Sequence, residues 1–199
     1  MELWNEIKEM FSESDKKIDI IPGKINNGLS NLKASNVNEN STFGSIIKNS
    51  AGITIDNWIF LFAQKNKQNK GIIDYKENGN QIVGYDAVGG IFSINLGKFN
   101  DGIGKLWYFS PIDLSWRNLE ISYAEFIAWI AQSDLDEFYD FVPKNELQEN
   151  CEELKMGKAI LFYPLLCSDE FSIATASKVI VSFDELYKIE MELSSGISN

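Results

Sequence analysis

The sequence predicts an α+β domain, in which a mostly antiparallel, twisted sheet of about five to seven strands is packed on one side by helices. Three observations support this prediction. Short apolar or alternating segments recur between residues 52 and 110 and again between residues 159 and 181. Turn signals built from glycine, proline and asparagine separate these segments. Amphipathic segments with helical spacing lie around them.

The centre of the predicted sheet runs from Gln81 to Trp116. An apolar strand over residues 82–85 ends at Asp86, and the glycine pair Gly89-Gly90 then interrupts the strand pattern. Residues 91–96 alternate between apolar and polar side chains, which is typical of a half-buried strand. About eight polar residues connect this strand to an aromatic strand over residues 106–109, and the spacing predicts a long-looped antiparallel hairpin.

Other elements follow from local patterns. Apolar runs predict further strands over residues 52–55, 58–63, 72–75, 159–163 and 178–181. Helical spacing predicts helices over residues 2–11, 122–132, 135–142 and 182–193, two of which begin with Ser-x-x-Glu capping boxes. We expect an N-terminal helix and a polar linker region that packs on the core over residues 1–50. A single domain would span residues 51–193, with a frayed tail at 194–199.

The chain is acidic. Its 199 residues include 18 lysines and arginines against 29 aspartates and glutamates, which gives a formal net charge of -11. Arg117 is the sole arginine. Nucleic-acid binding requires a basic footprint, so this composition argues against a direct nucleic-acid partner. An acidic protein favours partners with a basic surface and is repelled by anionic membranes.

Two scarce residue types exclude several chemistries. The absence of histidine excludes Ser-His-Asp and Cys-His catalysis and removes the commonest zinc ligand. Cys151 and Cys167 are too few and too widely spaced for a disulfide framework, so we expect reduced thiols and a cytoplasmic location. The first residues show no signal-peptide pattern, and the longest apolar run is too short to span a membrane. We predict no catalytic residue, metal or cofactor.

Five groups of residues are candidate sites. Asp86 with Gly89-Gly90 could offer a carboxylate and backbone N–H groups to a ligand, or could form a turn whose aspartate caps its own backbone. Asp86, Asp113, Glu120 and Glu125 could supply paired carboxylates for acid–base chemistry, although no spacing requires them to converge.

The loop from Gly102 to Lys105 is not a phosphate-binding loop, because its spacing is wrong and a strand follows it. Trp107, Trp116 and Trp129 could line a groove or simply belong to the core. The acidic outer face of residues 134–140 could be a solvated surface or a docking surface for a basic partner.

Several motifs in a fixed order resemble a bacterial family of unknown function, numbered 2625. The motifs are Asp86-Ala87-Val88-Gly89-Gly90, Phe92 with Asn95, Tyr108-Phe109-Ser110-Pro111, Leu114-x-Trp116, Tyr123-x-x-Phe126 and Asp134-Leu135-x-x-Phe138-Tyr139. The chain departs from the family pattern where Asn57 replaces a His-Gly pair and Phe60 replaces an arginine. A weaker likeness connects the chain to the SUKH (SMI1/KNR4) superfamily, which implies an immunity protein that neutralises a bacterial toxin.

We therefore expect a protein-binding module, with an immunity-type inhibitor of a basic toxin as its specific form. The alternatives are a small carboxylate-based hydrolase and a structural homo-oligomer without catalytic activity. The candidate binding residues are Asp86, Gly89, Gly90, Asn95, Asp113, Trp116 and Glu120.

Overall fold

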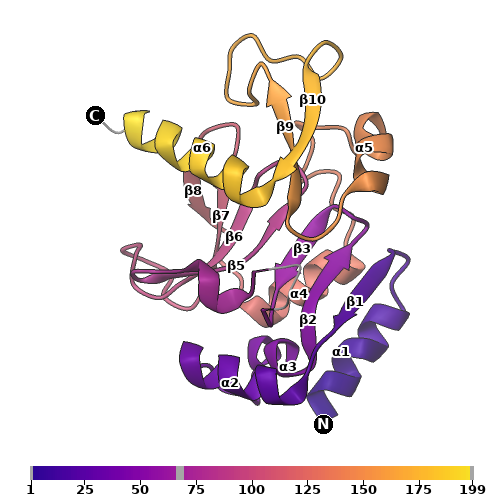
Figure 1. The fold of residues 1–199 in the computed structure, drawn as a ribbon, viewed down its shortest axis with the longest axis vertical. Coiled ribbons are helices and arrows are strands. Elements are labelled where there is room, and N and C mark those ends of the chain that lie inside the picture. Colours follow the sequence, from indigo (N-terminus) through magenta and orange to yellow (C-terminus); the bar gives the residue numbers. More distant parts are fainter. Residues whose placement is uncertain (1, 66–69, 198–199) are drawn as a thin grey trace.

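The computed structural model describes residues 2–65 and 70–197 and confirms the α+β class. The described strands form an eight-stranded antiparallel sheet in the order β1-β2-β3-β5-β6-β7-β8, with β4 paired to β5, and a separate hairpin of β9 and β10 (Figure 1). The strands are β1 Ile18–Pro22, β2 Ser50–Ile55, β3 Ile59–Phe62, β4 Lys76–Glu77, β5 Asn80–Asp86, β6 Ile91–Asn95, β7 Leu106–Ser110, β8 Ser115–Asn118, β9 Lys158–Tyr163 and β10 Ser177–Ser182. The helices are α1 Glu2–Ser12, α2 Ile25–Ser35, α3 Thr42–Asn49, α4 Tyr123–Gln132, α5 Gln148–Glu153 and α6 Phe183–Ile197, and the 3-10 helices are η1 Ile72–Tyr75 and η2 Lys144–Leu147.

The register of the central strands sets the two faces of the sheet. Phe92 of β6 lies opposite Tyr108 of β7, and the Phe92 ring packs against Phe126 of α4 with centroids 4.8 Å apart. Because successive side chains alternate between faces, Tyr85 of β5 points the other way, where its ring stacks on Phe183 of α6 at 4.0 Å. Each central strand therefore contributes to two apolar layers.

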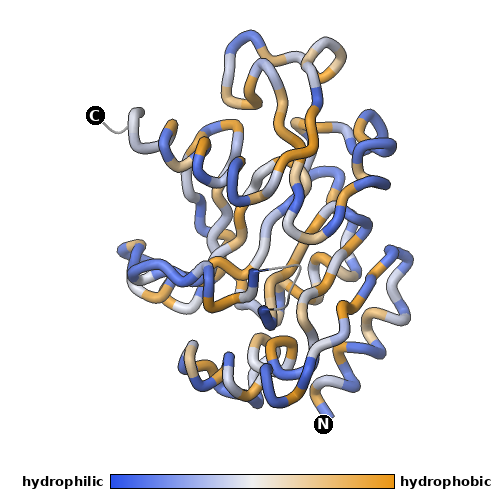
Figure 2. Tube along the Cα trace, viewed as in Figure 1, coloured by the Kyte–Doolittle hydropathy of each residue, from blue (hydrophilic) through white to orange (hydrophobic). Residues whose placement is uncertain are grey.

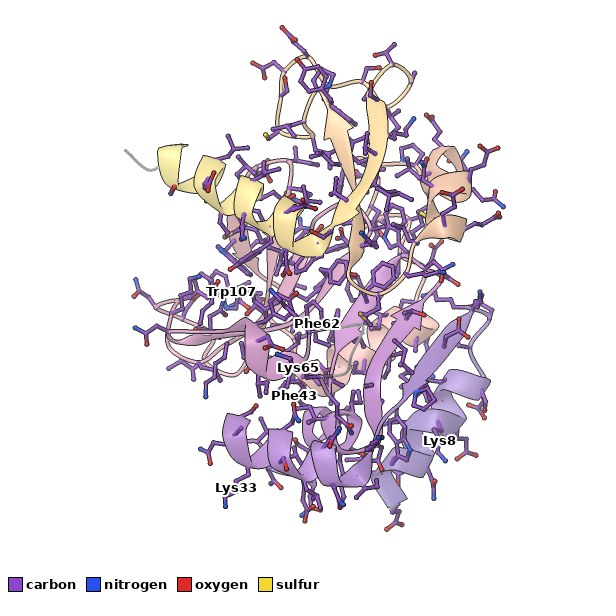
Figure 3. The ribbon with its side chains drawn as sticks, viewed as in Figure 1. Lys8, Lys33, Phe43, Phe62, Lys65 and Trp107 are labelled. Carbon is purple, nitrogen blue, oxygen red and sulfur yellow. The ribbon has the colours of Figure 1, made fainter. Side chains whose placement is uncertain are left out.

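Both faces of the sheet are covered. Helix α4 lies on the Phe92 face together with α1 and α3, with which it is in contact. The opposite face carries the β9-β10 hairpin and the start of α6, where Phe62 (labelled in Figure 3) packs against Phe183 with centroids 5.8 Å apart. Figure 2 shows apolar and polar residues interleaved along the helices, as expected of amphipathic helices that cover a sheet. The sequence placed helices on one side only, because nothing local indicates which face a distant C-terminal helix covers.

The polar N-terminal region joins the main sheet. Strand β1 pairs with β2 through a register that places Ile20 opposite Ile53. Helices α2 and α3 follow, and α3 begins at the cap residue Ser41, whose hydroxyl accepts a hydrogen bond from the Gly44 N–H at 3.0 Å. Residues 18–49, where the composition predicted a polar linker, thus form regular elements in the structure.

The segment at residues 72–75, predicted as an edge strand, is instead the 3-10 helix η1. The Asp74 carboxylate accepts a hydrogen bond from the Gly71 N–H at 2.8 Å, and this local bond favours a turn over an extended ladder. At the C-terminus, the predicted frayed tail begins inside α6. Helix α6 continues to Ile197, and the Ser194 hydroxyl donates to the Leu114 carbonyl at 3.0 Å.

The segment at residues 135–142, predicted as a second short helix, consists of turns. A hydrogen bond with helical spacing joins the Tyr139 N–H to the Leu135 carbonyl at 3.1 Å. The consecutive rings of Phe138 and Tyr139 both pack into the molecule, against Tyr108 and Trp58 respectively. A regular helix turns successive side chains by about 100° and would separate these two rings.

Candidate functional site

A buried carboxylate, Asp86, lies at the end of β5 and organises the turn that leads into β6. Its side chain is fully buried. One carboxylate oxygen accepts hydrogen bonds from the backbone N–H groups of Gly90 at 2.8 Å and Val88 at 3.1 Å. The other oxygen accepts a hydrogen bond from the Tyr108 hydroxyl at 2.8 Å. Asp86 therefore caps its own backbone turn. The sequence allowed two interpretations, a ligand site and a capped turn, and the structure shows the capped turn.

Two tyrosines complete what we call the Asp86 cluster, formed by Asp86, Tyr108, Tyr139 and the backbone of Gly90. Burial raises the pKa of the Asp86 carboxyl, while its hydrogen-bond donors, led by the Tyr108 hydroxyl, act in the opposite direction. Burial and the nearby Asp86 charge raise the pKa values of Tyr108 and Tyr139 well above their usual range. Both phenols therefore stay protonated at neutral pH; the Tyr108 hydroxyl donates to the carboxylate, whereas the Tyr139 hydroxyl has no hydrogen-bond partner within the described residues.

The glycine pair is required by close approaches on two sides. A Cβ atom on Gly90 would lie 2.1 Å from an Asp86 carboxylate oxygen and 2.1 Å from the Tyr108 hydroxyl oxygen. A Cβ atom on Gly89, whose φ is +106°, would lie 2.2 Å from a carboxylate oxygen of Glu190. The two glycines thus lie between the Asp86 cluster and a second buried carboxyl group on α6.

That second group, Glu190, is 5% exposed. Its Oε2 atom has no hydrogen-bond partner in the described part of the chain. It borders a small cavity of about 20 Å³ whose other walls are almost entirely apolar, including Leu186 and Leu193. Burial, followed by repulsion from Asp86, raises the pKa of the Glu190 carboxyl well above its usual value. We infer from this environment that Glu190 is protonated at neutral pH.

A groove of about 550 Å³ opens where β7 and β8 meet α4 and the turns of residues 134–141. We call it the Arg117 groove, because Arg117 is the only cationic residue among the described residues that line it. Four carboxylates and three aromatic side chains share that lining: Asp113, Asp134, Glu137, Asp140, Trp129, Phe138 and Phe141. The groove is therefore a strongly acidic hollow with aromatic walls and one guanidinium.

The Arg117 side chain is exposed and lies over two rings. Its guanidinium carbon is 4.7 Å from the centre of the Phe138 ring and 5.1 Å from that of Tyr108. No ion pair of Arg117 occurs within residues 2–65 and 70–197. The hydrogen bond from Tyr108 to Asp86 fixes one of the two supporting rings, so the buried cluster lies directly behind the groove.

Asn95 and Trp116, two further predicted binding residues, have structural contacts. The Asn95 amide donates to the carbonyls of Phe99 at 3.1 Å and Asp101 at 2.7 Å, and its oxygen accepts from the Gly97 N–H at 2.9 Å. Asn95 therefore shapes the loop of the β6-β7 hairpin. The Trp116 ring packs against Phe99 with centroids 5.4 Å apart, on the hairpin rather than in the groove.

The predicted carboxylates are not brought together. Asp86 is buried, and Asp113, which precedes the N-terminal end of β8, lines the Arg117 groove. Glu120 follows the other end of β8 and is exposed, while Glu125 forms the capping box of α4 with Ser122. These positions give separate environments, whereas an acid–base pair needs two carboxylates around one reacting bond.

The remaining aromatic and thiol candidates also lie in separate places. Trp107 (labelled in Figure 3) stacks on Phe99 with centroids 3.9 Å apart, whereas Trp129 lines the Arg117 groove. Burial raises the pKa of the Cys151 thiol to about 11, so this thiol is not a nucleophile at neutral pH. Cys151 and Cys167 are both free.

The described part of the chain contains neither a cation site nor a membrane-spanning helix. In the described ranges, no histidine, cysteine, aspartate and glutamate side chains gather into a group of three that could hold a metal ion. Over the same ranges, no helix combines the length and the apolar character needed to cross a membrane.

Sequence reasoning missed three residues of this region. Arg117 is notable in the sequence only for its rarity, and Phe138 only as part of a predicted helix and of a motif that resembles the family. Glu190 had a readable signal, because it follows Leu186 by four residues and precedes Leu193 by three, which places it on the apolar face of α6. A lone acid at such a position is a candidate for a buried carboxyl.

Comparison with known proteins assigns the chain to a family. Residues 2–186 match the family described as protein of unknown function DUF2625, and the chain belongs to it. An uncharacterised protein of Haemophilus influenzae is 29% identical over 161 residues, which cover 74% of this chain and 71% of that protein. The uncharacterised Escherichia coli protein YbfG is 24% identical over 198 residues, covering 96% of this chain and 91% of YbfG. No solved structure matches the chain.

Proposed function

We propose that this member of the DUF2625 family is a protein-binding module, whose Arg117 groove receives a segment of a partner with a basic surface. One observation supports the proposal above the others. Four carboxylates and three half-buried aromatic side chains surround a hollow of about 550 Å³ on a chain whose formal net charge is -11. Such a field attracts a cationic partner, and aromatic walls provide contact area for its aliphatic stems.

An immunity-type inhibitor of a basic toxin is the specific form of this proposal. Inhibitors that act in the producing cell benefit from fast, electrostatically steered association. The free thiols of Cys151 and Cys167 fit a reducing cytoplasm, which is the compartment we propose. The hydrolase alternative would require two converging carboxylates, and the separation of Asp86, Asp113 and Glu120 gives it no support.

The test compares two variants with the same change of charge. The groove variant neutralises three carboxylates by Asp134→Asn, Glu137→Gln and Asp140→Asn. The control neutralises three exposed carboxylates outside the groove by Glu146→Gln, Glu149→Gln and Glu153→Gln. Each protein is used as bait in a lysate of the source bacterium, with washes at low and at high salt, and eluted proteins are identified by mass spectrometry.

We expect a basic protein to bind the wild type and the control at low salt, to dissociate at high salt, and to be absent from the groove variant. Screening at high salt should weaken the interaction because its attraction is mainly electrostatic. A partner that binds equally to the groove variant, or with the same affinity at both salt concentrations, would contradict the proposal.

A further inference from the structure

Arg117 has a binding capacity that the fold does not use. A guanidinium carries five N–H donors in a planar fork that matches a carboxylate. Residues 2–65 and 70–197 provide no ion pair to this group, although four carboxylates line the same groove. The guanidinium instead stacks on Phe138 at 4.7 Å and Tyr108 at 5.1 Å. A contact of this kind with a ring uses no N–H donor, so the five donors of Arg117 stay available.

We infer that Arg117 is a carboxylate anchor and that the groove binds a basic C-terminal peptide segment. The α-carboxylate of the chain end pairs with Arg117, and lysine or arginine side chains next to it pair with Asp134, Glu137 and Asp140. This inference rests on the proposed function and specifies the chemistry of the partner at the same groove.

Charge complementarity selects this kind of ligand. A purely anionic ligand would be repelled by four carboxylates, and a purely cationic ligand would place a positive charge against Arg117. A ligand with several cationic groups and one carboxylate matches both. The end of a basic chain has this composition without any special sequence, because every unmodified chain end supplies one carboxylate. The groove volume of about 550 Å³ suits a few residues rather than a folded surface.

The Asp86 cluster holds the anchor in place. The Tyr108 hydroxyl donates to Asp86 at 2.8 Å, and the Tyr108 ring supports the Arg117 guanidinium. A supporting ring that is fixed from behind limits the positions of the guanidinium and reduces the entropy lost on binding. Asp86 and Tyr108 are therefore positioning residues, and they make no contact with the ligand themselves.

The decisive experiment compares two tetralysine peptides by calorimetry at low ionic strength. One peptide has a free C-terminal carboxylate, and the other has a C-terminal amide. The amide has one more net positive charge, so general attraction to an acidic groove predicts that the amide binds more tightly. An anchor at Arg117 predicts the opposite order, with the free acid favoured by about tenfold, because a charge-assisted bidentate pair is gained.

Arg117→Gln should reverse this preference, so that the amide binds more tightly. Lys155→Gln removes an exposed positive charge elsewhere and should leave the preference of the wild type unchanged. Arg117→Lys should retain only part of the preference, because an ammonium cannot form the bidentate pair. Near-ultraviolet circular dichroism of each variant verifies that the aromatic packing is intact.

The outcomes separate the anchor from the proposed function. If the triple groove variant weakens both peptides but the wild type prefers the amide, the anchor is refuted and the acidic docking groove stands. If an amidated tetralysine with an internal aspartate binds as tightly as the free acid, the inference that the ligand is a C-terminal chain end is refuted. If both peptides bind the triple groove variant as tightly as the wild type, or neither binds the wild type at low ionic strength, both ideas fail.

Discussion

The unpartnered Glu190 carboxyl predicts an unusual dependence of stability on pH. Its pKa is raised in the folded protein by burial and by Asp86, from a usual value of 4.5. As pH rises above this value, the unfolded chain loses its proton while the native carboxyl keeps it. The unfolded state then binds fewer protons than the native state, so the free energy of unfolding falls with rising pH. The fall ends once pH exceeds the native pKa.

The size of the effect follows from linkage. One group that is protonated only in the native state changes the free energy of unfolding by about 1.4 kcal/mol per pH unit. Glu190 is 5% exposed, so solvent screens its surroundings little and its pKa stays raised in the native state, which sets the pH range over which this slope applies. Glu190→Gln keeps the shape of the side chain and removes its titration. The difference in unfolding free energy between the variant and the wild type should therefore grow with pH above about 4.5.

Urea unfolding of both proteins at a series of pH values between 5 and 8 would measure this difference. Glu192→Gln provides the control, because Glu192 lies on the same helix and is exposed. The Asp86 carboxyl contributes a pH dependence of the same sign, which remains in the variant and cancels to first order in the comparison. Parallel profiles for the wild type and Glu190→Gln would refute a protonated, buried Glu190.

Three further predictions concern stability, each measured by urea unfolding. Tyr108→Phe removes a donor to the buried Asp86 carboxylate and should cost about 1.5 to 3 kcal/mol; an unchanged midpoint would show that this hydrogen bond contributes nothing. Gly90→Ala should cost about 1 to 3 kcal/mol because its Cβ would lie 2.1 Å from a carboxylate oxygen. Gly196→Ala, with no atom within 4 Å of the new Cβ, should cost nothing, and equal losses in both alanine variants would contradict the steric explanation. Ser122→Ala removes the cap of α4 and should cost about 1 kcal/mol, whereas full retention of stability would mean that water replaces the cap.

The elements that local patterns determine were predictable from the sequence. The alternating residues 91–96 and the aromatic residues 106–109 correspond to β6 and β7. A strand with a buried face requires apolar side chains on that face whatever its neighbours are, so the local pattern is enough to identify it. The capping boxes at Ser122 and Ser182 mark the starts of α4 and α6. These signals are also local, because the cap and its glutamate are only three residues apart.

Features that depend on distant partners could not be predicted. Strand β1 forms because Ile20 finds Ile53 across the sheet, and no pattern around residue 20 indicates that pairing. Residues 135–142 have helical spacing, yet tertiary contacts of Phe138 and Tyr139 override it. The Arg117 groove joins Arg117 of β8 to the ring of Phe138, which is distant in the chain, and only the folded sheet places the two together.

The glycine pair explains how two buried carboxyl groups coexist on either side of one turn. Asp86 has three hydrogen-bond donors of normal geometry, whereas the Oε2 atom of Glu190 has none in the described chain. Two buried carboxylates near each other cannot both ionise at low cost, so the charge resides on the group with the donors and the proton on the other. The negative charge then lies behind Tyr108, whose hydroxyl donates to Asp86 and whose ring supports the Arg117 guanidinium. In this arrangement the buried cluster stabilises the turn and also fixes one of the two rings that support Arg117.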